Sequence, residues 1–105
     1  MPLTRGRLLL LEQVKEKDWR EQVLTWARRT RWRCYFTWRS DHSPAGFPDL
    51  VLCRPPRVLF IELKTEGGDT SGAQDDWGWD LCQCEGVEYY LWRPHDEEQV
   101  LEVLK

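Results

Sequence analysis

The chain has 105 residues and a formal net charge of -3, which suits one compact domain and excludes a uniformly basic nucleic-acid-binding protein. Charge is unevenly spread, because residues 1–40 hold ten Lys and Arg against four Asp and Glu, whereas residues 66–105 hold two against eleven. This polarity allows a basic, DNA-facing side, although solvated helix faces explain the acidic half equally well. The sequence shows no signal peptide and no membrane-spanning segment, so we expect a cytoplasmic protein.

Residues 1–14 precede the clearest helical pattern and leave two alternatives open. The leucines at 8–11 predict either an extension of the first helix or an arm that packs on a partner. From Lys15 to about Arg31, apolar residues recur at helical spacing and predict an amphipathic helix. We therefore divide the chain into an arm or helix extension, 1–14, and a single domain, 15–105.

Glu16 is expected on the inward face of this helix, three residues before Trp19 and seven before Val23. A carboxylate on a core-facing stripe needs a partner, and a metal site would supply one. The helix macrodipole also favours a Glu near the helix N-terminus, which is an equally good structural explanation.

Arginines and aromatic residues alternate where this helix ends and the next strand, predicted over 33–38, begins. Arg pairs with phosphate and aromatic rings stack on bases, so this stretch and the polar loop 39–45 predict DNA contacts. Part of the cluster also suits the dipole at the helix C-terminus, and a loop His is most often merely solvated. The candidate DNA-binding residues are Arg28, Arg29, Arg31, Arg39, Ser40 and His42.

Two apolar runs flank the segment 54–57 and predict a β-hairpin with a four-residue loop. This loop pairs residue 53 with residue 58, and the same register places Asp49 opposite Glu62. Because side chains alternate along a strand, Lys64 shares the face of Glu62. The open end of the hairpin is therefore expected to gather two carboxylates and an ammonium group.

Two carboxylates directly opposed on one face of a sheet repel each other unless something compensates. A divalent cation would compensate, because Mg²⁺ takes oxygen ligands, often one or two carboxylates together with a substrate phosphate. The structural alternative is an exposed hairpin end with solvated charges. The turn Gly-x-Pro-Asp at 46–49, added to the opposed Glu62, favours the metal site, in which Lys64 would hold the attacking water or the phosphate.

The segment Ser-Gly-Ala-Gln at 71–74 has the pattern of a capping box that opens a second helix, which fully explains Gln74 in structural terms. Gly86 is expected to stop that helix, and residues 87–92 predict the last strand. Asp96 with Gln99 predicts another cap before a short closing helix. The resulting order, α-β-β-β-α-β-α, predicts an α/β fold with a mixed sheet and helices on its faces.

Gly-x-Pro-Asp at 46–49, a short hairpin and Glu-Leu-Lys at 62–64 together resemble the core of the PD-(D/E)XK nucleases. With Gln74 downstream and Trp-Arg-Pro at 92–94, the chain resembles more narrowly the virus-type replication-repair nuclease family, VRR-NUC, in its stand-alone phage or bacterial form. The resemblance covers residues 15 to 104. It implies a restriction-endonuclease-like αβββαβ core with a mixed four-stranded sheet flanked by helices.

The resemblance also implies an activity, namely hydrolysis of DNA with Mg²⁺ or Mn²⁺ as cofactor. The substrate would be branched DNA, such as a Holliday junction or a flap, in a bacterium or a phage-infected cell, and a homodimer would resolve junctions. Asp49, Glu62 and the backbone carbonyl of Leu63 would bind the metal. Lys64 would orient the water, and Gln74 would support Lys64 or the water.

The family carries an acidic residue on its first helix, for which Glu16 is the match and Glu12 and Glu21 are alternatives. By this resemblance Glu16 would be a third metal ligand, directly or through water.

Two rival functions stay open. One is a non-catalytic DNA-binding or assembly module that keeps the nuclease fold, and the other is a nuclease for RNA or single strands. The complete set of Asp49, Glu62 and Lys64 argues against the first, whereas the acidic total charge argues for it.

Overall fold

The computed structural model of the chain describes residues 4–37 and 41–105. Its elements are α1 (Arg5–Glu12), α2 (Glu16–Arg29), β1 (Arg33–Phe36), β2 (Leu50–Arg54), β3 (Arg57–Leu63), α3 (Gly72–Gln83), β4 (Glu88–Trp92), the 3-10 helix η1 (Pro94–Asp96) and α4 (Glu97–Leu104). The predicted order of helices and strands is confirmed, with α1 before it and η1 added ahead of the closing helix. None of the described helices is long and apolar enough to cross a membrane.

The strands form one four-stranded mixed sheet in the order β1-β2-β3-β4. Strand β2 is antiparallel to both β1 and β3, whereas β4 is parallel to β3. A parallel neighbour requires a crossover connection, and α3 lies in that connection. The predicted register of the hairpin is confirmed, because Cys53 pairs with Val58 and Leu50 with Ile61. The predicted four-residue loop is too long, because Arg54 pairs with Arg57 and leaves a two-residue turn at 55–56.

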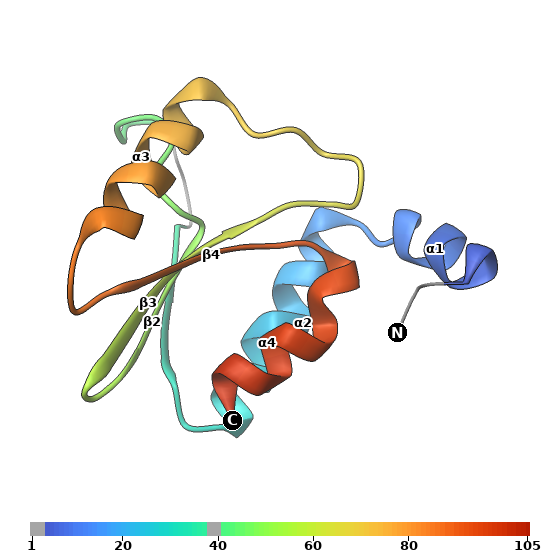
Figure 1. The fold of residues 1–105 in the computed structure, drawn as a ribbon, viewed down its shortest axis with the longest axis horizontal. Coiled ribbons are helices and arrows are strands. Elements are labelled where there is room, and N and C mark those ends of the chain that lie inside the picture. The colour runs from blue at the N-terminus through green and yellow to red at the C-terminus, as the bar shows by residue number, and fades with distance from the viewer. Residues whose placement is uncertain (1–3, 38–40) are drawn as a thin grey trace.

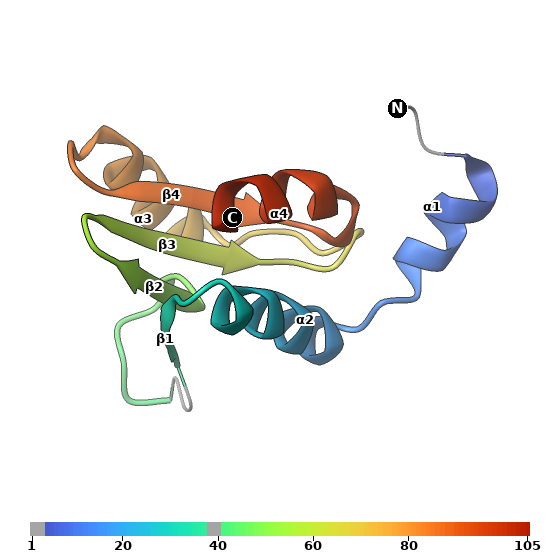
Figure 2. The same ribbon diagram turned by 90° about the horizontal axis from the view of Figure 1, so that it is seen from below.

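Helices cover both faces of this sheet. Helices α2 and α4 lie together on one face and α3 lies on the other (Figures 1 and 2). Because side chains alternate along a strand, the core residues of β2 and β3 face α2 and α4, and the residues between them face α3. The most buried members of the core are Val23, Leu24, Ala27, Leu50, Leu52, Leu59, Ile61, Leu63, Trp92, Val100 and Leu104.

The N-terminal leucines form a helix of their own, α1, which residues 13–15 separate from α2. This helix projects from the rest of the molecule (Figure 2). Three of its leucines are exposed, Leu8 to 39%, Leu9 to 51% and Leu10 to 67%, whereas Leu11 is half-buried. An ion pair of 3.2 Å joins Arg7 of α1 to Glu97 of α4.

Helix α2 ends at Arg29, close to the predicted boundary, in a Schellman motif. The backbone N–H of Arg31 donates to the carbonyl of Arg28 at 3.1 Å, and that of Trp32 donates to the carbonyl of Ala27 at 3.0 Å. Arg31 has a φ of 71°, a left-handed conformation that glycine usually supplies at this position.

At the turn end of the β2–β3 hairpin, two arginines bind groups from the C-terminal part of the chain. Arg54 donates to the carbonyl of Leu104 at 3.2 Å and lies over the ring of Trp32, 4.3 Å from its centroid. The guanidinium of Arg57 donates hydrogen bonds to both carboxylate oxygens of Glu88, at 2.7 and 2.8 Å. The hairpin turn is thereby fastened to β4 and to the end of α4.

The predicted cap of the closing helix is confirmed in position, because Asp96 is the N-cap residue of α4, but not in its side-chain bond. Asp96 makes no side-chain capping bond to α4, and its Oδ2 instead accepts the backbone N–H of Arg93 at 2.8 Å. The reason is Pro94, which suits the first position of a helix and starts η1 ahead of α4. Asp96 therefore caps the turn that precedes the helix.

Candidate active site

Asp49 and Glu62 meet at the open end of the hairpin, on the face of the sheet that α3 covers. The side chain of Glu62 is almost fully buried, with 2% of the residue exposed. Oδ2 of Asp49 accepts the backbone N–H of Leu63 at 2.8 Å. This bond holds Asp49 beside β3, as the predicted pairing requires, and leaves its other carboxylate oxygen for a further contact.

The surroundings of Glu62 disfavour its ionised form. Burial, followed by the charge of Asp49 and a hydrogen bond with it, raises the pKa of Glu62 from 4.5 to about 8. The nearby ammonium of Lys64 lowers this pKa, and the carboxylate of Glu16 raises it. The fold therefore favours the protonated form of Glu62, and a bound cation would compete with that proton.

The predicted capping box of Gln74 is confirmed, and the same side chain also contacts Glu62. Its Oε1 accepts the backbone N–H of Ser71 at 2.9 Å, and Oγ of Ser71 accepts the backbone N–H of Gln74 at 3.2 Å, which completes the capping box. Its Nε2 donates to Oε1 of Glu62 at 3.0 Å. The cap of α3 thus determines which end of the amide faces the carboxylates, and Gln74 is a contact of Glu62.

Gly46 explains how the segment before Asp49 fits between the sheet and α3. It has a φ of 89°, and a Cβ atom at this position would collide with the backbone of Ala73 in the first turn of α3. Phe47 then packs edge to face against Trp77, with ring centroids 5.0 Å apart. Only glycine permits this approach, and the approach places Asp49 and Gln74 on neighbouring elements.

The predicted inward position of Glu16 is wrong, because its side chain is exposed in the first turn of α2. Trp19 and Val23 occupy the inward stripe, whereas Glu16 lies where a carboxylate favours the helix dipole. The alternatives Glu12 and Glu21 are exposed as well. Within the described parts of the chain, no three His, Cys, Asp or Glu side chains lie close enough to hold one metal ion. The effect of Glu16 on Glu62 is electrostatic, because the Glu16 carboxylate raises the pKa of Glu62.

The predicted DNA-binding arginines of α2 lie at the opposite end of that helix from the carboxylates of Asp49 and Glu62. Glu16, whose charge reaches Glu62, begins the helix, while Arg28 and Arg29 are exposed at its other end. Fourteen helical residues span about 20 Å. Arg31, also exposed, follows the helix. These three arginines therefore lie at a distance from the carboxylates and not beside them.

The remaining DNA-binding candidates belong to the loop between β1 and β2. His42 is exposed and lies 3.6 Å from the carboxylate of Asp41. Arg39 and Ser40 lie outside the described residues. Only His42 of this group can be placed, and it lies on the segment that leads to Asp49.

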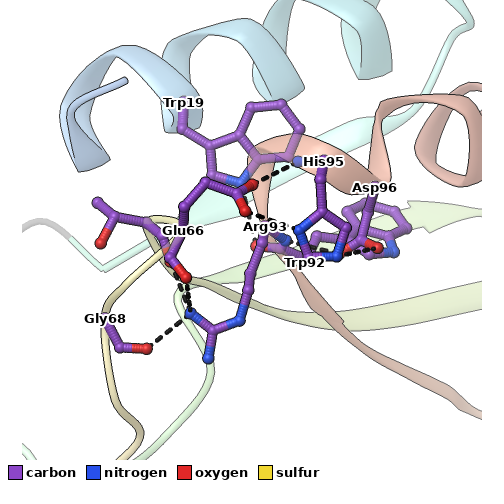
Figure 3. Close-up of polar contacts among 8 residues, drawn as sticks. Trp19, Glu66, Gly68, Trp92, Arg93, His95 and Asp96 are labelled. Carbon is purple, nitrogen blue, oxygen red and sulfur yellow. Dashed lines mark hydrogen bonds and ion pairs between the residues drawn. The ribbon is translucent and has the colours of Figure 1, made fainter. Parts of the chain in front are cut away.

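A set of polar contacts, which no pattern in the sequence predicted, fastens the segment after Lys64 to residues 92–96 (Figure 3). The guanidinium of Arg93 donates to the carbonyls of Thr65 and Gly68, both at 2.6 Å. The Glu66 carboxylate accepts the backbone N–H of His95 at 2.6 Å and contacts its Nδ1 at 2.8 Å. We call this set of residues, 65–68 with 93–96, the latch.

Next to the latch, two donors share the carbonyl of Trp92. Nε1 of Trp19 donates to it at 3.0 Å (Figure 3). The backbone N–H of Lys64 donates to it at 3.1 Å. The backbone is thus held both at Lys64 and immediately after it. Bonds to main-chain carbonyls demand no particular residue in the segment that provides the carbonyl, so the residue types did not predict these contacts.

No protein-family model, curated protein or solved structure matches the chain. The resemblance to the nuclease family therefore depends on the short motifs at 46–49, 62–64 and 74, and on their geometry.

Proposed function

We propose that this chain is a divalent-metal-dependent DNA endonuclease with a restriction-endonuclease-like core of the VRR-NUC type. The order of α2, β1, β2, β3, α3 and β4 agrees with the αβββαβ order of that core. The observation that carries the proposal is the buried Glu62, which lies against Asp49 and receives the amide of Gln74. Two neighbouring carboxyl groups at a buried position reduce the stability of the fold. Such a cost is typical of a functional site.

The residues at the hairpin end fit Mg²⁺ or Mn²⁺. They offer two carboxylates, and such an ion is commonly bound by one or two carboxylates with waters and substrate phosphate completing its shell. Asp49 and Glu62 would hold it, with the carbonyl of Leu63 as a further ligand by family resemblance. When bound, the ion would activate water and neutralise charge on the phosphate.

The side chains around these carboxylates have separate tasks. Gln74 orients Glu62 through its 3.0 Å bond, and the cap of α3 fixes Gln74 in turn. Lys64 carries the positive charge beside Glu62, where it would orient the attacking water and stabilise negative charge that develops on the phosphate. The bond from the Lys64 N–H to the carbonyl of Trp92, together with the adjoining latch, keeps the backbone at Lys64 in place.

Branched DNA, such as a Holliday junction or a flap, is the substrate that we propose, in a bacterium or a phage-infected cell. The exposed arginines at the far end of α2, Arg28 and Arg29, would contact phosphates about 20 Å from the cut, which is several nucleotides along a strand. Resolution of a four-way junction requires two cuts, and a homodimer would supply both active sites.

The test is cleavage of a labelled panel, namely a four-way junction, a flap, a single strand and a linear duplex, with Mn²⁺ or Mg²⁺. Wild type should cut a branched substrate only with metal, and Lys64→Ala should cut at least about a hundredfold more slowly, because it loses charge stabilisation in the transition state. Equal cutting by both proteins would assign the activity to a contaminant or to another site.

The rival proposal, a DNA-binding or assembly module without catalysis, is favoured by the lack of a third acidic ligand among the described residues. Binding of Mn²⁺ distinguishes the nuclease from the non-catalytic module. A working site should raise the melting temperature in Mn²⁺, and Asp49→Ala should remove that increase. Metal-independent DNA binding with no thermal response to Mn²⁺ would favour the module.

A further inference from the structure

A cavity of about 530 Å³ opens beside Asp49 and Gln74. It lies between the end of β1, the loop that leads to Asp49, and the first turns of α3. Its volume falls within the range of small-ligand pockets, roughly 300–1,000 Å³. Nothing in the proposed roles of Asp49, Glu62, Lys64 and Gln74 requires this space.

The walls of the cavity are aromatic and hydroxylic. Tyr35, Phe47 and Trp77 contribute rings, and Thr37 and Ser43 contribute hydroxyl groups. Tyr35 is 60% exposed, so a ligand could cover its ring without displacing any part of the core. Aromatic rings and a few hydrogen-bonding groups are the usual lining of a site that accepts a planar ring.

Charge decides which part of a nucleic acid fits. Among the described residues that line the cavity there is no Lys or Arg, and Asp49 brings a carboxyl to its edge. Among these described lining residues a phosphate would find no cationic partner, and away from a bound metal ion Asp49 would repel it. A nucleobase is neutral and planar, carries hydrogen-bonding edges and stacks on aromatic side chains whatever its sequence.

We infer that this cavity binds an unpaired nucleobase of the strand that is cut, beside the phosphate that Asp49 and Glu62 face. The inference depends on the proposed nuclease function and defines its substrate as DNA with an unpaired nucleotide next to the cut, as at a flap or a branch point. A base that stays stacked in a continuous duplex cannot enter such a pocket without being flipped out, which costs free energy.

Photo-crosslinking tests this placement without any need for cleavage. A flap substrate carries 5-iodouracil at the first unpaired position, is bound to the full chain in Ca²⁺ in place of Mg²⁺, and is irradiated. Mass spectrometry should locate the adducts on Tyr35, Phe47 or Trp77. Trp79 is the internal control, because it is 69% exposed on the same helix as Trp77 and lines a different cavity.

Cleavage rates give the second readout. Tyr35→Ala should slow flap cleavage roughly ten- to a hundredfold, the range expected when one aromatic stacking partner is removed, and should slow linear-duplex cutting much less. Trp79→Ala should match wild type on both substrates. Adducts outside the cavity, or equal effects of Tyr35→Ala and Trp79→Ala on the flap, would overturn the inference.

The two proposals fail in different ways. Adducts in the cavity without any metal-dependent cleavage would keep the base-binding site and refute the nuclease. Metal-dependent cleavage with adducts elsewhere would keep the nuclease and refute the base-binding site. A chain that binds none of these DNAs would refute both.

Discussion

At the turn end of the β2–β3 hairpin, Arg57 grips the carboxylate of Glu88 with two bonds, so opposite charges meet and each has a partner. At the open end of the same hairpin, Asp49 and Glu62 bring two carboxyls together, and burial raises the pKa of Glu62 to about 8. The same two strands thus carry an arginine that is paired with a glutamate at the turn end and two neighbouring acidic groups at the open end.

The difference distinguishes a carboxylate that stabilises the fold from carboxyls that are candidates for a function. The hydrogen bond from Arg57 lowers the pKa of Glu88, which means that the fold favours the ionised form of Glu88. The fold favours the protonated form of Glu62. A group that stabilises the fold when charged needs no further explanation, whereas a buried carboxyl that destabilises it when charged is a candidate for binding a cation.

The largest expected effect is therefore on Glu62. Its folded pKa lies above its unfolded value of 4.5, so ionisation removes stability as the pH rises from 4.5 through about 8. Each pKa unit corresponds to about 1.4 kcal/mol. Glu62→Gln keeps the amide contact of Gln74 and lacks this charge, so in EDTA it should melt at least about 5 °C above wild type at pH 9 and close to wild type at pH 4.5.

The same variant should lose metal-dependent cleavage and the thermal response to Mn²⁺. In wild type, cleavage at low Mg²⁺ should increase as the pH rises through about 8, because the ion competes with the proton on Glu62, and higher Mg²⁺ should shift this rise to lower pH. A stability difference between Glu62→Gln and wild type that does not change with pH would show that Glu62 is already ionised without metal.

The register of the β2–β3 hairpin was sufficient to predict that Asp49 and Glu62 lie side by side. Alternation and a four-residue loop placed Asp49 opposite Glu62, and the structure brings them together. Glu16 was misplaced because helical periodicity cannot tell the edge of an apolar stripe from its centre. The contacts of Arg93 were missed because they end on main-chain carbonyls, which leave no trace in the residue types.

The matched variant at the turn end is Glu88→Gln, which should have the opposite sign. The folded pKa of Glu88 lies below its unfolded value of 4.5, so its contribution is present above pH 4.5 and is lost as the pH falls through the folded pKa. Because the pair is about one third exposed, we expect a loss of about 1 kcal/mol at pH 7, measured by urea unfolding.

Cleavage by Glu88→Gln should equal that of wild type once both proteins are fully folded. Loss of cleavage in this variant at a temperature where it remains folded would mean that the turn end also contributes to the site, and the contrast between the two ends would not hold.

The smallest effect concerns Arg31, which lies beyond α2, away from the carboxylates. Its φ of 71° strains a side-chain-bearing residue, so Arg31→Gly should stabilise the fold by about 0.5–1 kcal/mol, with the higher entropy of unfolded glycine offsetting part of the gain. If the arginine is retained for DNA, the same variant should bind DNA more weakly, and the slope of log affinity against log salt should fall by about one. A gain in stability with unchanged DNA affinity would make Arg31 a cap residue only, and it would leave Arg28 and Arg29 as the proposed phosphate contacts at this end of the molecule.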